Sequence, residues 1–406
     1  MNIPLSSPDI GEAEVDAVTR ALRSGNLSLG PRVSEFEEEF ADYMGTRYAV
    51  ATNSGTSALH LCVKALGIGP EDEVLTTSFS FVASANCLLY ERALPVFVDI
   101  HPGTLNIDPA EIRETLTSEY SWERDKCRLA NRRSGRILKA ILPVHVFGTP
   151  CEMTSILEIA REFNLGILED ACEALGSRYR GQLAGTFGDV AAFAFYPNKQ
   201  MTTAEGGMVV TNDPQIARLC RSLRNQGRDE QSAWLRHIAL GYNYRLSDLH
   251  CALGLAQLRR IDGLLSSRAR VAAEYSRALA QIPGITLPDE SFESRRSWFV
   301  YVIQLQGPSP GRRRDSLIAG LRARGIACQA YFPPIHRQPY FEKIALSRTS
   351  SLPQTDLAAG RCLALPFFSS MTNEQIAEVC AAVRELLSEG TDGAYPSQKQ
   401  FSASAG

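Results

Sequence analysis

The stretch "AFAFYPNKQMTTAEGGMVV", residues 192–210, places a single lysine between two segments of apolar residues. The first apolar run, 190–196, stops at Pro197, and Lys199 follows in a short polar loop before a second apolar segment at 206–211. A lysine at the exit of a strand is normally solvated, but a lysine held near apolar walls can lose its proton and act as a nucleophile. The stretch therefore predicts two buried strands joined by a loop that carries one candidate nucleophile.

Strands and helices alternate on both sides of this lysine loop. Apolar runs predict strands at 47–52, 73–77, 94–100, 137–148, 165–170, 189–195 and 206–211. Helical spacing follows the first of them, with Leu59, Val63 and Leu66 on one face. This alternation favours an α/β fold with a largely parallel sheet covered on both faces. Ligands gather beyond the carboxyl ends of the strands in such sheets, so the loops there are the places to search for a site.

The rest of the chain reads as three helices followed by a second α/β pattern. The predicted helices are 214–224, 246–261 and 264–281, and the later elements are strands at 297–305, 326–332 and 361–367 with helices at 313–324 and 372–388. We therefore expect an N-terminal segment and large domain at 1–262 and a smaller C-terminal domain at 263–389. Residues 390–406 are small and polar and are predicted to form a disordered tail.

The polar segment 118–136 contains six basic and three acidic side chains. It is predicted to form a solvated surface loop. The alternative is a basic lip beside a site for an anionic ligand.

Composition excludes several classes of protein. The 406 residues are 44% hydrophobic and 21% charged, which is typical of a soluble globular protein. A net charge of −3 does not favour a nucleic-acid partner, and no apolar run approaches the ~18 residues of a membrane span. The first residues show no secretory signal, and ten cysteines without a CxxC pair indicate reduced thiols rather than disulfides or a metal site. We expect a cytoplasmic protein with no metal.

Two further loops carry groups that bind charged ligands. In "TNSGTSALHL", 52–61, a strand ends and a helix begins, and the free N–H groups of a helix N-terminus with nearby hydroxyls form an anion site. Ser and Thr are also ordinary helix caps. In "ILEDACEALGS", 167–177, Asp170 ends a buried strand, where an acid is costly without a partner. Asp170 is either a cap or ion-pair residue, or a carboxylate that holds a cationic ring nitrogen.

One cofactor fits these three signals together, namely pyridoxal 5′-phosphate (PLP). Its aldehyde needs a Schiff-base lysine, its pyridinium an acid, and its phosphate a helix N-terminus. A fourth stretch, "GYNYRLSDLHCALGLAQL", puts Asn243 and Arg245 just before a helix, where they could reach an anion.

With these motifs in view, the sequence resembles the DegT/DnrJ/StrS family of sugar aminotransferases from about residue 3 to residue 388. The landmarks include "GNLSLGPRVSEFEEEFA", "SGTSALHL", "SFSFVASAN", "PVFVDI", "EDACEALGS", "FYPNKQMTTAEGG", "GYNYRLSD" and "YFPPIHRQPYF". The resemblance implies the aspartate-aminotransferase fold, PLP-dependent transferase fold type I. Its large domain has a mostly parallel sheet of seven strands, and a smaller α/β domain follows.

The resemblance also assigns roles around the cofactor. Lys199 is expected to hold PLP as a Schiff base and later to move protons, and Asp170 to pair with the pyridine nitrogen. The phosphate would be held by three residues at the helix start, Gly55, Thr56 and Ser57. Phe81 would cover the cofactor ring, with a core aromatic as the alternative.

Other assigned residues concern the substrate and a second subunit. Asn243 is expected to reach the phosphate of the neighbouring subunit, which implies a homodimer with composite active sites. Arg245 is a candidate for an anionic part of the substrate. Tyr331 and His336 fall in the loop that faces the sugar, although a lone histidine is as often structural.

The sequence departs from the family pattern at three positions. Ala194 stands where many members have a serine that donates to the phosphate. Glu173, expected near the cofactor's phenolic oxygen, replaces glutamine or histidine; two negative groups there are unfavourable unless one is protonated or a cation intervenes. Ala204 replaces the commoner glycine and indicates that this position does not need a positive φ.

The expected reaction moves an amino group from an amino acid, taken to be L-glutamate, to a nucleotide-linked keto-sugar. Amino-sugar, polysaccharide or antibiotic-sugar biosynthesis would use such a product. A dehydratase-like PLP enzyme is one alternative, but the family's dehydratases lack the lysine. A non-catalytic regulator is the other, and a degraded lysine or aspartate would favour it, whereas this chain has both.

Overall fold

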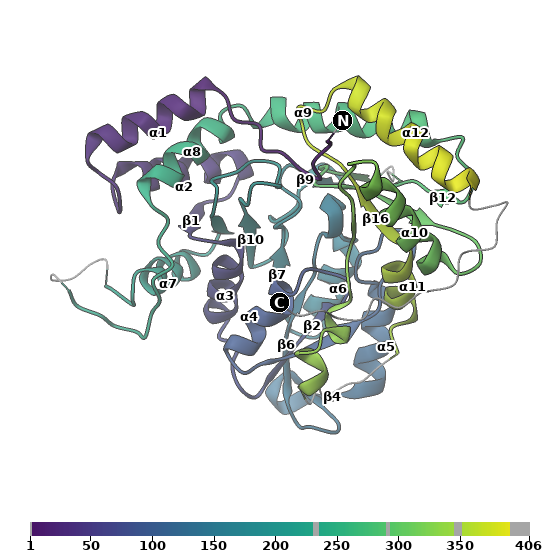
Figure 1. Ribbon diagram of the computed structural model, residues 1–406. Helices are drawn as coiled ribbons and strands as arrows, with labels where there is room; N and C mark the ends of the chain where they lie inside the picture. Colours follow the sequence, from purple (N-terminus) through teal and green to yellow (C-terminus); the bar gives the residue numbers. More distant parts are fainter. Residues whose placement is uncertain (1, 230–234, 290–292, 345–350, 390–406) are drawn as a thin grey trace, which may run out of the picture.

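The computed structural model describes residues 2–229, 235–289, 293–344 and 351–389. A large sheet forms the centre of the molecule and a four-stranded sheet lies in the C-terminal part (Figure 1). A third, small sheet joins β13 (Ser294–Arg295), β8 (Arg178–Tyr179) and β9 (Gln182–Leu183). No helix of the described ranges has both the length and the apolar character needed to cross a membrane.

The main path of the large sheet has seven strands in the order β1-β11-β10-β7-β6-β2-β3. Their bounds are β1 (Tyr48–Thr52), β2 (Asp72–Thr77), β3 (Leu94–Val98), β6 (Ile137–Leu142), β7 (Gly166–Asp170), β10 (Val190–Ala194) and β11 (Gly207–Thr211). Pairs from β10 to β3 are parallel, whereas β11 runs antiparallel to both β10 and β1. The predicted α/β fold with a mostly parallel sheet is confirmed.

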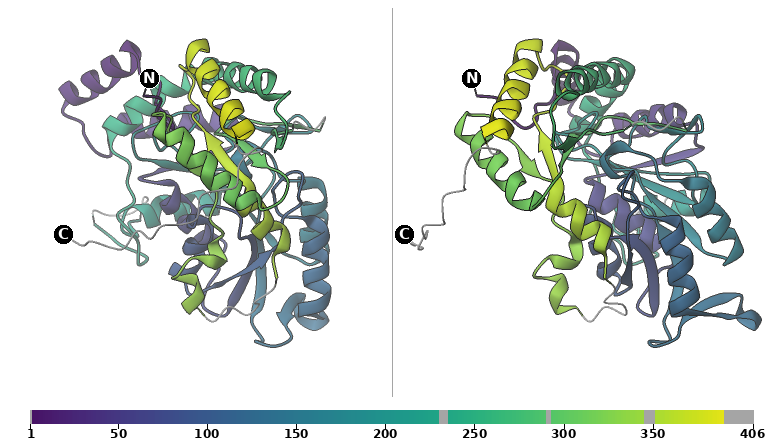
Figure 2. Two further views of the ribbon diagram at one scale, coloured as in Figure 1. Left: turned by 45° about the vertical axis from the view of Figure 1, so that its right-hand side comes forward. Right: turned by 90° about the vertical axis from the view of Figure 1, so that its right-hand side faces the viewer.

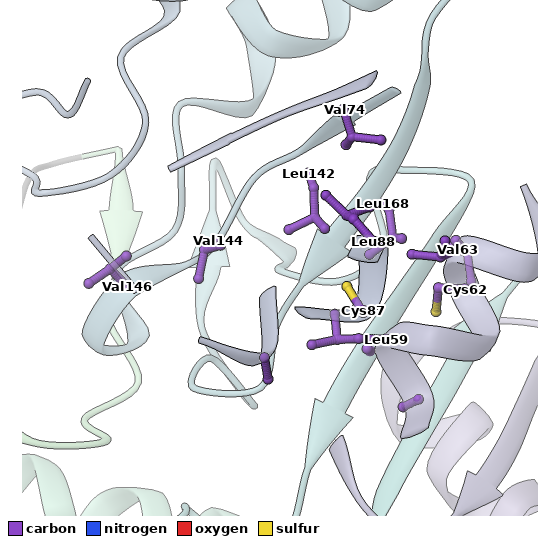
Figure 3. Packing of buried hydrophobic residues seen from close by; sticks show 14 of the residues in the cluster. Leu59, Cys62, Val63, Val74, Cys87, Leu88, Leu142, Val144, Val146 and Leu168 are labelled. Carbon is purple, nitrogen blue, oxygen red and sulfur yellow. The ribbon is translucent and has the colours of Figure 1, made fainter. Parts of the chain in front are cut away.

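Helices cover both faces of this sheet, which explains why nearly all residues of its strands are buried. They are α2 (Pro31–Met44), α3 (Gly55–Ala65), α4 (Ala83–Tyr90), α5 (Pro109–Glu119), α6 (Met153–Glu162), α7 (Pro214–Arg224) and α8 (Asp248–Leu258), and α1 (Glu12–Ser24) packs on α8. On one face, Leu59 of α3 and Leu88 of α4 pack with Val74, Leu142 and Leu168 of the strands (Figure 3). The start of α3 is thereby fixed against the sheet.

The smaller sheet is antiparallel and has the order β12-β14-β16-β15. Its strands are β12 (Ile285–Thr286), β14 (Tyr301–Leu305), β15 (Gln329–Ala330) and β16 (Cys362–Leu365), and its helices are α9 (Ile261–Leu279), α10 (Pro310–Ala323), α11 (Pro353–Arg361) and α12 (Asn373–Glu389). Helices α9 and α12 lie side by side (Figures 1 and 2).

The two parts share helix α9 and the first residues of the chain. Ile261 and Leu264 of α9 pack in the core under α2, whereas Val271 and Tyr275 belong to the C-terminal core. Ile3 is also buried in the C-terminal core. The boundary at 262 and 263 stays a prediction, and the predicted tail at 390–406 lies outside the described residues.

The segment 118–136 is largely exposed, as we predicted, but it is not a loop. It forms a hairpin of β4 (Tyr120–Glu123) and β5 (Arg128–Asn131), and β5 pairs with β6. The buried Tyr120 hydroxyl donates to the buried carboxylate of Glu73 at 2.5 Å. Because Glu73 lies at the start of β2, the hairpin joins the sheet at the end opposite to the carboxyl ends of the parallel strands, away from the position of a basic lip (Figure 2).

The expectation for Ala204 is also wrong. Its φ is +66°, in the left-handed region that favours glycine. The Ala204 amide donates to the Thr202 hydroxyl at 2.9 Å, and the Thr203 hydroxyl donates to the Glu205 carbonyl at 2.8 Å. These local hydrogen bonds hold a conformation that the sequence alone did not require.

Substitution of Ala204 by glycine should therefore stabilise the protein slightly. Relief of the left-handed strain exceeds the extra freedom that glycine adds to the unfolded chain, so we expect a gain of about 0.5–1 kcal/mol. Urea denaturation of the cofactor-free protein measures this difference. Ala204→Val is the control and should lose stability, because a β-branched side chain tolerates positive φ poorly. A glycine variant less stable than wild type would contradict the account.

Candidate active site

A cavity of about 430 Å³ opens where the loops after β7 and β10 meet the start of α3. Seven of the predicted site residues line it: Gly55, Thr56, Phe81, Asp170, Glu173, Lys199 and Tyr331. Four others do not: Ser57, Asn243, Arg245 and His336.

The pairing of β7 with β10 explains why Asp170 and Lys199 meet. The two strands are parallel, and Asp170 lies opposite Ala192 in their register. Both strands therefore end at the same edge of the sheet. Asp170 is the last residue of β7, and the lysine loop follows β10. A turn with a hydrogen bond of 2.9 Å from the Lys199 amide to the Tyr196 carbonyl then brings the lysine back over the cavity.

Lys199 is held between a carboxylate and an aromatic ring. Its Nζ lies 3.6 Å from Oε1 of Glu173 and 3.9 Å from the centroid of the Phe299 ring. Only 13% of the lysine side chain is exposed. An ion pair and a cation–π contact in a largely dry site fix the position of the amine.

Glu173 is the group that sequence reasoning left open. Its Oε2 accepts a hydrogen bond from the Phe147 amide at 2.9 Å. Burial raises the pKa of Glu173 above its ordinary value, and this exceeds the opposing effects of Lys199 and the Phe147 amide. Burial therefore favours the protonated form of Glu173, and the amine of Lys199 lies beside its carboxyl group.

Asp170 is fixed by hydrogen bonds from neutral donors. The Ser84 hydroxyl donates to Oδ2 at 2.7 Å, and the Cys172 amide donates to Oδ1 at 3.1 Å. Ser80 and Ser84 share a hydroxyl contact of 2.8 Å. Across the described ranges, no Lys, Arg or His forms an ion pair with Asp170. The buried carboxylate thus retains the capacity to pair with a cation in the cavity.

The N-terminus of α3 forms another wall. Ser54 caps the helix, since its Oγ accepts from the Ser57 amide at 3.1 Å. Gly55 has no room for a side chain, because a Cβ there would lie 2.6 Å from the Cβ of Ala194. Gly55 and Thr56 line the cavity, and the first N–H groups of a helix lack acceptors within the helix. Ala194 therefore lies directly beside the N-terminus of α3.

Aromatic side chains form the remaining walls. Phe81 is 59% exposed, which excludes the alternative of a core aromatic. Tyr331 stacks on Phe332, with ring centroids 4.9 Å apart. His336 lies outside the cavity; its Nδ1 is 2.7 Å from the Ser78 hydroxyl and its Nε2 is 3.3 Å from Asp356. These contacts favour a structural His336, and its contact with substrate stays a prediction.

Asn243 and Arg245 lie between α7 and α8, outside the cavity of their own chain. Asn243 is exposed. The next residue, Tyr244, accepts from the Asn53 amide at 2.9 Å, and Arg245 donates to the Asn225 side chain at 3.0 Å. The reach of Asn243 into a neighbouring subunit stays a prediction.

Ser84 and Phe299, which contact Asp170 and Lys199, were not among the predicted site residues. Ser84 could have been found, since it follows Ser80 by four residues and therefore lies on the same face of a helix start. Phe299 had no local signal, because it lies about a hundred residues beyond Lys199 and comes from the segment before β14. Only the packing of the two sheets brings it to the lysine.

Comparisons with known proteins agree with this geometry. Residues 8–384 match the sequence pattern of the DegT/DnrJ/EryC1/StrS aminotransferase family. The chain is 37% identical to the spore coat polysaccharide biosynthesis protein SpsC of Bacillus subtilis, over 96% of this chain and 98% of that protein. It is 38% identical to GDP-perosamine synthase of Caulobacter vibrioides, over 95% of this chain and 98% of that protein. The crystal structure of DesI with its TDP-sugar product superposes with a TM-score of 0.84 at 30% identity, covering 96% and 94% of the chains.

The raised pKa of Glu173 predicts a pH effect on stability. Because the folded protein binds this proton more tightly than the unfolded chain, the stabilisation is complete below the ordinary pKa of 4.5 and is lost as the pH rises through the folded-state pKa. Glutamine cannot lose a proton and can still accept from the Phe147 amide. The stability of Glu173→Gln relative to wild type should therefore increase as the pH rises above 4.5 and through the folded-state pKa of Glu173, measured by urea denaturation of the cofactor-free proteins.

Glu14 provides a control of opposite sign. Burial alone would raise its pKa, but hydrogen bonds from Gln257, the Gly11 amide and Arg260 lower it. Its stabilisation is present above pH 4.5 and lost as the pH falls, so Glu14→Gln should lose stability relative to wild type as the pH rises. A difference between Glu173→Gln and wild type that does not change with pH would contradict the proposed environment of Glu173.

Proposed function

The chain belongs to the DegT/DnrJ/EryC1/StrS aminotransferase family, a family of PLP-dependent sugar aminotransferases, and on this premise we propose that it binds PLP and transfers an amino group from L-glutamate to a nucleotide-linked keto-sugar. One observation carries the proposal: a single cavity brings together the amine of Lys199, the carboxylate of Asp170 and the start of α3. These are the three groups that anchor this cofactor.

The residues fit PLP on physical grounds. Lys199 supplies a primary amine against an apolar ring. Asp170 is buried, has two neutral donors and can pair with a protonated pyridine nitrogen. Gly55 and Thr56 offer the first N–H groups of α3 to a phosphate. The Ser57 amide donates a hydrogen bond to the Ser54 cap. We therefore propose that Ser57 contacts the phosphate only through its hydroxyl.

Each of these residues has a distinct task in the proposed reaction. Bound PLP supplies an electron sink for negative charge on the donor's Cα. Lys199 holds the cofactor, is displaced by the donor amine, and then carries a proton from the donor's Cα. Asp170 keeps the ring nitrogen protonated, and Phe81 covers the ring. Glu173 would lie near the phenolic oxygen, and the burial that raises its pKa favours the form that adds no second negative charge there.

The proposed substrates follow from the relatives. GDP-perosamine synthase and DesI with its TDP-sugar product support a nucleotide-linked sugar as acceptor. SpsC supports a place in polysaccharide biosynthesis. Donor and acceptor would use the same cavity in turn, which gives ping-pong kinetics. Tyr331 and Arg245 are the proposed sugar and anion contacts, and the cytoplasmic location expected from the sequence is part of the same proposal.

We also propose a homodimer with composite sites. Asn243 is exposed and lies outside the cavity of its own chain. The backbone around it is held to the loop before α3 by the hydrogen bond between Tyr244 and Asn53. The exposure of Asn243 outside its own cavity supports its contact with the phosphate in the other subunit.

Replacement of Lys199 tests the core of the proposal. Without an acceptor, the PLP-loaded protein should convert L-glutamate to 2-oxoglutarate in proportion to the number of loaded sites. In Lys199→Ala the rate of this step should fall by about a thousandfold or more, because the proton carrier is lost. Lys64→Ala is a matched control, since Lys64 pairs with Glu91 at 2.9 Å outside the cavity. Equal rates in the two variants would refute the assignment.

Restoring the family's serine should tighten cofactor binding. Ala194→Ser places a hydroxyl beside the start of α3, where one hydrogen bond to phosphate contributes on the order of 1 kcal/mol, or about fivefold in affinity. Titration of the cofactor-free protein with PLP measures the change. Ala194→Cys serves as a control for volume with a weaker donor. Unchanged or weaker binding in the serine variant would show that Ala194 is not beside the phosphate.

A mixed dimer tests the shared site. Lys199→Ala and Asn243→Ala should each impair activity, and a dimer with one subunit of each kind contains one site with both changes and one with neither. Co-expression with different affinity tags and purification of the mixed species should restore roughly half of the wild-type activity. If Asn243 served its own chain, each site would carry one change and nothing would be restored.

A further inference from the structure

Arg268, in the middle of α9, is a buried cation, and the negative charge of Asp9 acts on it from beyond ion-pair distance. Only 3% of the residue is exposed. Across the described residues it forms no ion pair with Asp or Glu. Burial lowers its pKa to about 10, so the guanidinium remains charged at neutral pH. Arginine is rarely buried in this way unless other groups take up its hydrogen bonds.

The guanidinium donates instead to backbone carbonyls of two distant segments. Its Nη2 lies 2.7 Å from the carbonyl oxygen of Lys199 and 3.4 Å from that of Asn198. Its Nη1 lies 3.2 Å from the carbonyl of Phe299 and 3.5 Å from that of Trp298. One planar fork therefore links the lysine loop of the large sheet to the segment that enters β14 of the smaller sheet.

These two segments supply both members of the contact around the lysine amine. Lys199 provides the Nζ, and Phe299 provides the ring whose centroid is 3.9 Å away. The opposite side of the amine is set by Glu173, whose carbonyl accepts from the Gln200 side chain at 2.6 Å. Arg268 holds the backbone beneath the amine and beneath the ring at once, so its position determines their separation.

We propose that Arg268 is a positioning residue for Lys199, which sets the place of the lysine amine against Phe299 and couples it to the C-terminal part of the chain. This inference rests on the proposed function, in which Lys199 holds PLP. Lysine cannot replace arginine in this role, because an ammonium is a point charge without the fork that reaches two segments.

The test compares Arg268→Lys and Arg268→Met with a control on the same helix. Arg270 donates to the Met371 carbonyl at 2.8 Å and to Asn373 at 3.3 Å, so it also ties α9 to the C-terminal part. Within the described residues, no hydrogen bond or ion pair joins Arg270 to the lysine loop. Arg270→Met therefore removes comparable hydrogen bonds between α9 and the C-terminal part, without changing any contact of Lys199.

The readout is the rate at which Lys199 reacts with PLP, independent of turnover. Each cofactor-free protein is mixed with PLP, quenched with borohydride at successive times and digested, and mass spectrometry measures the modified fraction of Lys199. Circular dichroism fixes a temperature at which every variant is folded. We expect both Arg268 variants to slow modification by about tenfold or more, because small displacements of a reacting group are costly, and Arg270→Met to stay within about twofold of wild type.

The outcomes separate the two proposals. If wild-type Lys199 is modified and Arg268→Lys reacts at the wild-type rate, the positioning role is overturned while the proposed function stands. If wild-type Lys199 is not modified at all, the proposed function fails and this role fails with it. Should Arg268→Met not fold, Arg268→Lys decides the question alone, since it retains the charge and most of the volume.

Discussion

Lys199 places a cation in a largely buried pocket with two carboxylates, and the surrounding structure depends on supplying partners to all three groups. A buried ionisable group without a partner costs several kcal/mol, roughly as much as a whole domain can spare. Here Glu173 accepts a hydrogen bond from the Phe147 amide and lies beside the lysine amine. Asp170 accepts hydrogen bonds from the Ser84 hydroxyl and the Cys172 amide. Each partner is fixed by another element, so the site requires the fold to be complete.

A second buried pair, formed by His145 and Glu169, fixes the end of β7 that carries Asp170. Glu169 lies 3.0 Å from His145 Nε2, with both side chains fully buried. The Glu169 carboxylate also accepts from the Gly185, Phe187 and Gly188 amides at 2.7–2.8 Å. The His145 amide in turn donates to the Asp170 carbonyl at 3.1 Å. This network fixes the backbone of β7 where its last residue enters the cavity.

The sequence predicted those features of the fold and the site that short segments of the chain determine by themselves. The apolar strands, the lysine loop and Asp170 at a strand end followed from short segments, and the structure brings Lys199 and Asp170 into one cavity. Two features were missed because tertiary contacts override local signals. Tyr120 and Leu129 are buried within a segment dominated by basic residues, and Ala204 is held at positive φ by hydroxyls of its neighbours. Phe299 and Arg268 reach the lysine from about seventy to a hundred residues beyond it, which no local pattern reveals.

Transfer of labelled nitrogen tests the central claim most directly. The protein, loaded with PLP, is incubated with L-glutamate carrying heavy nitrogen and a panel of GDP- and TDP-linked keto-sugars, and mass spectrometry follows each sugar nucleotide. The account predicts that at least one sugar gains a labelled amino group in place of its carbonyl oxygen, and that Lys199→Ala abolishes this product. Formation of 2-oxoglutarate without a labelled sugar from any member of the panel would contradict a keto-sugar as the acceptor.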